Sequence, residues 1–226
     1  MNKNEWIDPY LSSIFPPTPA LQAYLSSRNC TPSETEFLLL KEFSLIEEAP
    51  LPRGIKNLTY KYQNGLVVPL YTPLKAFAGL QIQDIHSKRF RRELTLKGHW
   101  NPIWLNIQNH MGKIWDGADI WLVEGIFDLI ALQRILGYDI VVLGCLTANL
   151  SVSQKNFLKR YAKNIKVVFD MDEAGDSGAE RVRIFAKINN IGYQRITYPA
   201  KDPADLLQER GLEASKSLFQ KYYYRL

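Results

Sequence analysis

Residues 120–128 read IWLVEGIFD, and residues 167–178 read VVFDMDEAGDSG. Each stretch begins with a continuous apolar run, which is typical of a strand buried on both faces. Each run ends abruptly in carboxylates beside a glycine. Because an unpaired charge at the tip of a buried strand is costly, two such tips predict a site that uses the charge.

The chain around these stretches alternates between two kinds of segment. From about Asp116 onward, each apolar run is followed by a segment in which apolar residues recur every three or four positions. We predict strands over 119–124, 139–144, 165–170 and 194–199, followed in turn by helices over 126–136, 151–162, 177–189 and 203–211. This alternation predicts an α/β fold with a mainly parallel sheet flanked by helices. Ligands of such sheets gather at the carboxyl ends of the strands, where Glu124 and Asp170 lie.

The chain before Asp116 differs in charge. Residues 1–52 hold three Lys and Arg against seven Asp and Glu, whereas residues 53–97 hold nine against two. We expect a short helix over 20–28, a further helix start within 31–43, and strands over 64–73 and 76–85. The expected parts are an acidic leader with a small basic mixed α/β subdomain over 1–115, the α/β domain over 116–211, and a C-terminal helix over 212–226.

Composition narrows the class of protein. The chain has 226 residues, of which 46% are hydrophobic, which is enough for a sizeable core. The net charge of +5 admits a polyanionic partner without requiring one. Cys30 and Cys145 are far apart, which excludes a zinc ribbon on ligand count and argues against a disulfide framework. No signal peptide or membrane span is recognisable, so we expect a cytoplasmic protein with no membrane association.

Six carboxylates lie at the predicted junctions between strands and helices. If the strands are neighbours, these charges converge on one edge and repel one another, so a cation must hold them together. Oxygen ligands without His or Cys favour Mg²⁺ or Mn²⁺. A single D-x-D is often only a helix cap, but three such junctions in series favour a metal site. The six acids are Glu124, Asp128, Asp170, Asp172, Asp202 and Asp205.

Four segments between residues 116 and 211 together resemble a Toprim domain, the metal-dependent fold of DnaG-type primases, topoisomerases, some nucleases and RecR-type proteins. They are VEGIFDLIAL, VVLGCLTANLS, VVFDMDEAGDSGA and YPAKDPADLL. Among these families the chain most resembles the DnaG-type primases. The loop LGCLTANLS, the motif KDPADLL and the upstream segment NGLVVPLYTPLKAFAGLQIQDI are each similar to a primase segment.

The resemblance implies a role for each acid. Glu124 matches the glutamate held to be catalytic, and Asp170 and Asp172 match acids that serve both catalysis and metal binding. Asp128, Asp202 and Asp205 match the acids that complete a site for Mg²⁺ or Mn²⁺, with two ions expected. The motif D-P-A-D is one residue longer than the family's D-P-D, so Asp205 is displaced from its match. Further departures mark a divergent member: Gln83, Val68 and Cys145 stand where arginine, phenylalanine and threonine are usual.

In a DnaG-type primase, the basic subdomain beside the Toprim domain holds the template and the incoming nucleotides. The resemblance therefore points to basic residues that neutralise phosphates and to aromatic residues that stack on bases. The alternative is a solvated charged hairpin with tryptophans in the core. The basic candidates are Lys88, Arg89, Arg91, Arg92, Lys97 and Lys201, and the aromatic candidates are Phe90, Trp100 and Trp104.

The resemblance predicts an enzyme, a primase core that makes short RNA primers on single-stranded DNA from nucleoside triphosphates. The alternatives are a Toprim nuclease and a non-catalytic nucleic-acid-binding accessory protein. The sequence holds no zinc-binding module and no helicase motif, so we expect a separate helicase or template-binding protein to act in trans. The helix over 212–226 is expected to pack back onto the sheet, with docking of that partner as the alternative.

Overall fold

The computed structural model describes residues 14–15, 19–30, 41–44, 64–75, 77–84, 90–94 and 103–223. The chain divides into two compact units, of which the first holds 1–70 and 77–97 and the second holds 71–76 and 98–226. This division differs from the boundary expected after residue 115. The reason is that Leu105 forms a β-bridge with Gly144, and the segment around it contributes side chains to the core of the second unit.

The first unit contains a five-stranded sheet and one described helix. The order of the strands across this sheet is the same as their order in the sequence. The expected helix over 20–28 and the expected strands over 64–73 and 76–85 are present. The helix start expected within 31–43 falls largely outside the described residues, and the last three residues of that segment belong to a strand, β2, that pairs antiparallel with β3. The elements are β1 (Ile14–Phe15), α2 (Pro19–Ser27), β2 (Lys41–Ser44), β3 (Asn64–Tyr71), β4 (Phe77–Asp84) and β5 (Phe90–Leu94).

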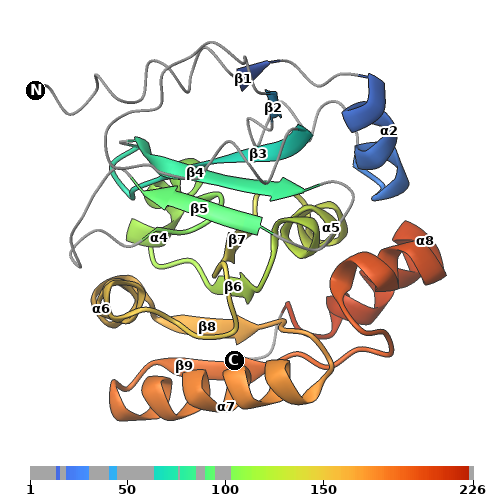
Figure 1. Cartoon of the computed structure of the whole chain (residues 1–226). Helices are drawn as coiled ribbons and strands as arrows, with labels where there is room; N and C mark the ends of the chain where they lie inside the picture. Colours follow the sequence, from blue (N-terminus) through green and yellow to red (C-terminus); the bar gives the residue numbers. More distant parts are fainter. Residues whose placement is uncertain are drawn as a thin grey trace, which may run out of the picture. The chain divides into compact units, whose positions relative to one another are not determined.

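The second unit is built on a four-stranded sheet in the order β7-β6-β8-β9, in which every neighbouring pair is parallel (Figure 1). This confirms the predicted α/β class with a parallel sheet flanked by helices. After η1 (Ile107–Asn109) and α4 (Met111–Trp115), the elements are β6 (Ile120–Val123), α5 (Ile126–Leu136), β7 (Val141–Gly144), α6 (Val152–Tyr161), β8 (Asn164–Val167), α7 (Glu173–Ile188), β9 (Gly192–Arg195) and α8 (Pro203–Gln220).

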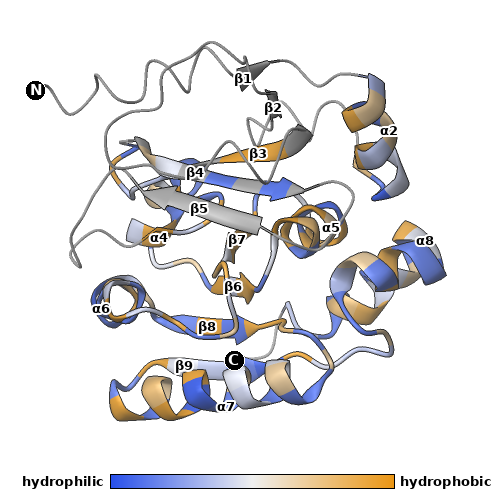
Figure 2. Cartoon of the chain, in the orientation of Figure 1, coloured by the Kyte–Doolittle hydropathy of each residue, from blue (hydrophilic) through white to orange (hydrophobic). Residues whose placement is uncertain are grey.

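The core of the second unit lies on both faces of this sheet. All four residues of β6 are buried, and Figure 2 shows this strand as hydrophobic. Ile120 and Leu122 belong to a cluster with residues of α4, α6 and α7. Trp121 points to the opposite face, because successive side chains of a strand alternate, and its ring lies 6.2 Å from that of Phe219 in α8. Helices α5 and α8 pack against each other.

The C-terminal segment packs back onto the sheet, as one of the two predicted alternatives had it. Helix α8 is kinked at Gly211, whose φ of 74° is non-helical. Beyond the kink, Phe219 is buried, and Lys166 on β8, itself buried, donates to the carbonyl oxygen of Tyr222 at 2.7 Å. Lys166 also pairs with Asp119 at 2.9 Å. No helix among the described residues is long and apolar enough to cross a membrane.

Candidate metal centre

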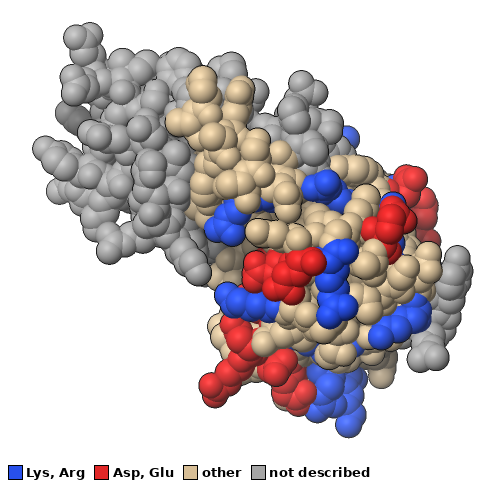
Figure 3. Space-filling view, turned by 90° about the vertical axis from the view of Figure 1, so that its right-hand side faces the viewer, with Lys and Arg blue, Asp and Glu red and all other residues tan. Residues whose placement is uncertain are grey.

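The parallel sheet brings two acid-tipped strands together. Strands β6 and β8 are direct neighbours, so their carboxyl ends reach the same edge. Glu124 follows β6, and its Oε1 accepts a hydrogen bond from the backbone N–H of Asp170 at 3.3 Å. Figure 3 shows acidic side chains gathered on this side, with lysine and arginine side chains beside them.

Three of the other acids cap helices. Asp172 is the N-cap of α7, and its Oδ1 accepts from the N–H of Gly175 at 2.9 Å. Asp202 caps α8 in the same way through the N–H of Asp205 at 2.7 Å, and Asp128 accepts from the N–H of Gly125 at 3.1 Å in the first turn of α5. Each cap uses one carboxylate oxygen, so capping fixes the side chain and leaves the second oxygen for another ligand.

The electrostatics of these acids show that they form one cluster. Burial, then repulsion from Asp170, raises the pKa of Glu124 to about 7. Burial, then repulsion from Asp202, raises the pKa of Asp128 to about 8. The pKa of Asp170 is raised to about 6, mainly by burial and next by repulsion from Asp202. Repulsion from Asp172 and Asp205 contributes less. Each of the five other acids therefore interacts with Asp170, which links the six into one cluster.

This donor set fits a hard divalent cation. Its ligands are carboxylate oxygens, which Mg²⁺ and Mn²⁺ prefer, and a cation would offset both the burial and the repulsion that raise the three pKa values. Within the described part of the chain, no three Asp, Glu, His or Cys side chains are already gathered into a coordination shell.

The glycine of the D-x-D-x-x-G motif permits a close backbone approach. A Cβ placed on Gly175 would lie 2.1 Å from the carbonyl oxygen of Asp170 and 3.0 Å from its nitrogen. Any side chain at this position would displace the backbone that carries Asp170. The first turn of α7 therefore lies directly against the loop that presents the acids.

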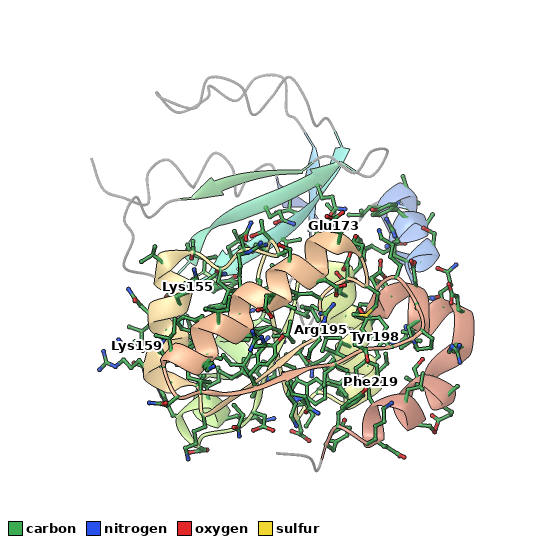
Figure 4. The ribbon with its side chains drawn as sticks, turned by 90° about the horizontal axis from the view of Figure 1, so that it is seen from below. Lys155, Lys159, Glu173, Arg195, Tyr198 and Phe219 are labelled. Atoms are coloured by element: carbon green, nitrogen blue, oxygen red, sulfur yellow. The ribbon has the colours of Figure 1, made fainter. Side chains whose placement is uncertain are left out.

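Two residues that the sequence did not single out hold that loop in place (Figure 4). Arg195, on β9, donates from Nη2 to the carbonyl oxygen of Asp170 at 2.9 Å and lies 3.3 Å from Oδ1 of Asp176. Tyr198 donates from its hydroxyl to the carbonyl oxygen of Phe169 at 3.2 Å. Burial raises the pKa of Tyr198, so its phenol stays a donor. Only the pairing of β8 with β9 brings these residues to the loop, and no local sequence signal marks them.

The predicted nucleic-acid residues have mixed outcomes. Lys88, Arg89 and Lys97 lie outside the described residues, as does Trp100. Arg91 and Arg92 lie on β5, opposite Ile82 and Gln81 of β4, and Phe90 begins the same strand.

The other two candidates belong to the second unit. Lys201 is exposed beside Asp202, and its positive charge acts on Asp170. The expectation that Trp104 stacks on bases was wrong. Trp104 is fully buried, and its ring lies 6.1 Å from that of Phe157 in the core.

Comparison with known proteins agrees with this geometry. Residues 121–207 match a family model described as Toprim-like. A DNA primase of Clostridium acetobutylicum is 29% identical over 189 residues, which cover 79% of this chain and 30% of that primase. Residues 121–207 form a Toprim-like domain. The resemblance predicted from the sequence is thereby confirmed.

Solved structures support the DnaG-type fold beyond the Toprim-like domain. The zinc-binding and RNA polymerase domains of the Aquifex aeolicus primase superpose with a TM-score of 0.73 at 18% identity, over 90% of this chain and 56% of that one. A DnaG primase catalytic domain bound to single-stranded DNA gives a TM-score of 0.70 at 14% identity, over 90% of this chain and 71% of that one. The chain thus spans less than a third of its Clostridium relative and about half of the Aquifex structure.

Proposed function

We propose that this chain is the catalytic core of a DNA primase, which joins ribonucleotides on a single-stranded DNA template by metal-dependent nucleotidyl transfer. The observation that carries the proposal is the cluster of six interacting carboxylates at three strand–helix junctions of a Toprim-like domain. The relative named as a DNA primase supports primer synthesis over cleavage.

The proposed roles follow from how each acid is held. Divalent cations bound here would neutralise the triphosphate and favour ionisation of the attacking 3′-hydroxyl. Asp128, Asp172 and Asp202 are fixed by their caps, so each would offer one oriented oxygen to a cation. Glu124 and Asp170 cap no helix, and we assign them the positions closest to the reacting atoms. Asp205 and Lys201 border the site, where Lys201 would contact a phosphate of the nucleotide.

Template capture is proposed to need a partner. The Aquifex aeolicus primase structure that this chain resembles holds a zinc-binding domain beside its RNA polymerase domain. A helicase or template-binding protein acting in trans would raise the local concentration of template at the site. Adding such a protein should increase primer yield most at low template concentration.

The test is incorporation of labelled ribonucleotides on single-stranded DNA with Mg²⁺ or Mn²⁺, run beside a DNA cleavage assay. Template-dependent products that Asp170→Asn abolishes would support the proposal. The matched control is Glu209→Gln, which removes one exposed acid of α8 that is not in the cluster. Cleavage of the DNA without incorporation would reassign the centre to a nuclease. Neither activity, with nucleic-acid binding intact, would make the chain an accessory protein.

A further inference from the structure

Helix α6 and the turn after it carry a surface with basic charge only. No Asp or Glu occurs between Asp139 and Asp170, whereas four basic residues lie within this segment outside the core. We call them the α6 basic ridge, which consists of Lys155, Lys159, Arg160 and Lys163.

These charges are not balanced by the protein. Among the residues that the structure describes, none of the four ridge residues forms an ion pair, and Arg160 lies over the ring of Tyr161 at 5.4 Å. Elsewhere in the same unit, Arg183 and Lys216 each pair with an acid three residues before them, Glu180 and Glu213. Like charges four residues apart destabilise a helix, so the ridge does not serve the stability of α6.

The packing of α6 fixes which way the ridge faces. Gln154, Phe157 and Leu158 form the buried side of the helix. Lys155 and Lys159 are one turn apart on α6, with a rise of about 6 Å, and Lys155 is half-buried whereas Lys159 is exposed (Figure 4). This rise is close to two phosphate steps of a nucleic-acid strand, whose phosphates are about 3.4 Å apart along a helix axis, so the two lysines can contact different phosphates of one strand.

The ridge begins beside the candidate metal centre. The N–H of Cys145 donates to the carbonyl oxygen of Val123, the residue before Glu124, at 2.8 Å. Gln154, in the first turn of α6, donates to the carbonyl oxygen of Cys145 at 3.1 Å. Lys155 therefore lies one residue from a direct contact with the loop that borders Glu124. From there α6 runs back along the sheet, away from the carboxylates.

We propose that the α6 basic ridge binds the phosphate backbone of the nucleic-acid strand that is engaged at the metal centre. The proposal rests on the proposed function and adds to it a binding surface within the Toprim-like domain. The α6 basic ridge has no acidic partners among the described residues and starts at the edge of the sheet that carries the carboxylates. Its charge therefore complements a polyanion that enters or leaves the metal centre at that edge. The ridge positions the strand and carries no base specificity, because its side chains offer charge alone.

The test compares two triple variants of equal charge. The first replaces Lys155, Lys159 and Lys163 by alanine, and the second replaces three basic residues of the α8 segment, Arg210, Lys216 and Lys221. Binding of fluorescent single-stranded DNA, and separately of an RNA–DNA hybrid, is measured between 50 and 300 mM salt. Each lost phosphate contact flattens the slope of log affinity against log salt by about 0.7 for a single strand. The ridge variant should therefore flatten it by about 2, and the α8 variant should leave it unchanged.

Two results would overturn the proposal: an unchanged slope in the ridge variant, or equal flattening in both variants, which reports net charge alone. The arm that changes more, single strand or hybrid, identifies the strand that the ridge holds. The ridge variant should bind Mn²⁺ like the wild type, so failure of the metal centre and failure of the ridge are separate outcomes. If the wild-type chain binds neither nucleic acid, the proposed function fails together with the ridge.

Discussion

Replacing Gly175 by alanine should disrupt the loop that presents Asp170. The added Cβ would lie 2.1 Å from the carbonyl oxygen of Asp170, whereas real Cβ atoms essentially never approach another heavy atom within 3.0 Å. About 1 Å of backbone displacement is needed, and the obstructing atom is backbone rather than a flexible side chain. Overpacking of this kind costs about 1–3 kcal/mol, which exceeds the gain of up to about 1 kcal/mol that alanine brings to a helix.

Gly112→Ala is the matched control. Gly112 lies in α4 with nothing within 4 Å of the added Cβ, so this variant should gain about 0.5–1 kcal/mol from reduced freedom of the unfolded chain. Urea unfolding measures both changes, and Mn²⁺ titration of Gly175→Ala should show an affinity loss of about tenfold or more, as is usual when the groups that position metal ligands are disturbed. If Gly175→Ala is as stable as Gly112→Ala and binds Mn²⁺ like the wild type, the close approach of α7 to Asp170 does not exist.

Three further predictions concern the acids and the contacts behind them. Because the pKa values of Glu124, Asp128 and Asp170 are raised in the folded protein, it binds more protons than the unfolded chain, so metal-free stability should fall as pH rises from about 4 to 8. Asp170→Asn should flatten that pH profile of the melting temperature, and a profile independent of pH would contradict the cluster. Tyr198→Phe leaves the carbonyl of Phe169 without its donor, which should cost about 1–2 kcal/mol in urea unfolding and weaken Mn²⁺ binding; a loss of stability alone would limit Tyr198 to a structural role. Lys166→Ala removes a buried charge that joins Asp119 and the carbonyl of Tyr222, which should cost about 3 kcal/mol, and an unchanged melting temperature would show that the C-terminal segment is not held there.

The sequence predicted those features of the second unit that local periodicity determines. Helix α5 has the predicted bounds, 126–136, because its apolar repeat begins directly after Gly125 and ends before Gly137. The acids could be predicted to meet because the carboxyl ends of parallel strands share an edge. Helix α7 begins at Glu173, four residues before its predicted start, because Asp172 caps it and draws the glycine-containing turn into the helix.

Features that depend on tertiary contacts could not be predicted. Arg195 and Tyr198 reach the loop at Asp170 only because β9 pairs with β8, and an isolated QRITYP segment carries no sign of that. Trp104 follows a basic, aromatic stretch, so its neighbours in sequence indicated a nucleic-acid surface. Its position is decided instead by packing against Phe157, a residue far along the chain.

The central claim is that the six carboxylates form one centre for divalent cations. Its most direct test is a titration with Mn²⁺ in which electron paramagnetic resonance counts the ions that remain free. The wild-type chain should bind two ions saturably, Asp170→Asn should lose at least one of them or bind at least about tenfold more weakly, and Glu209→Gln should match the wild type. Absence of saturable binding to the wild type, or equal binding by Asp170→Asn, would contradict the claim.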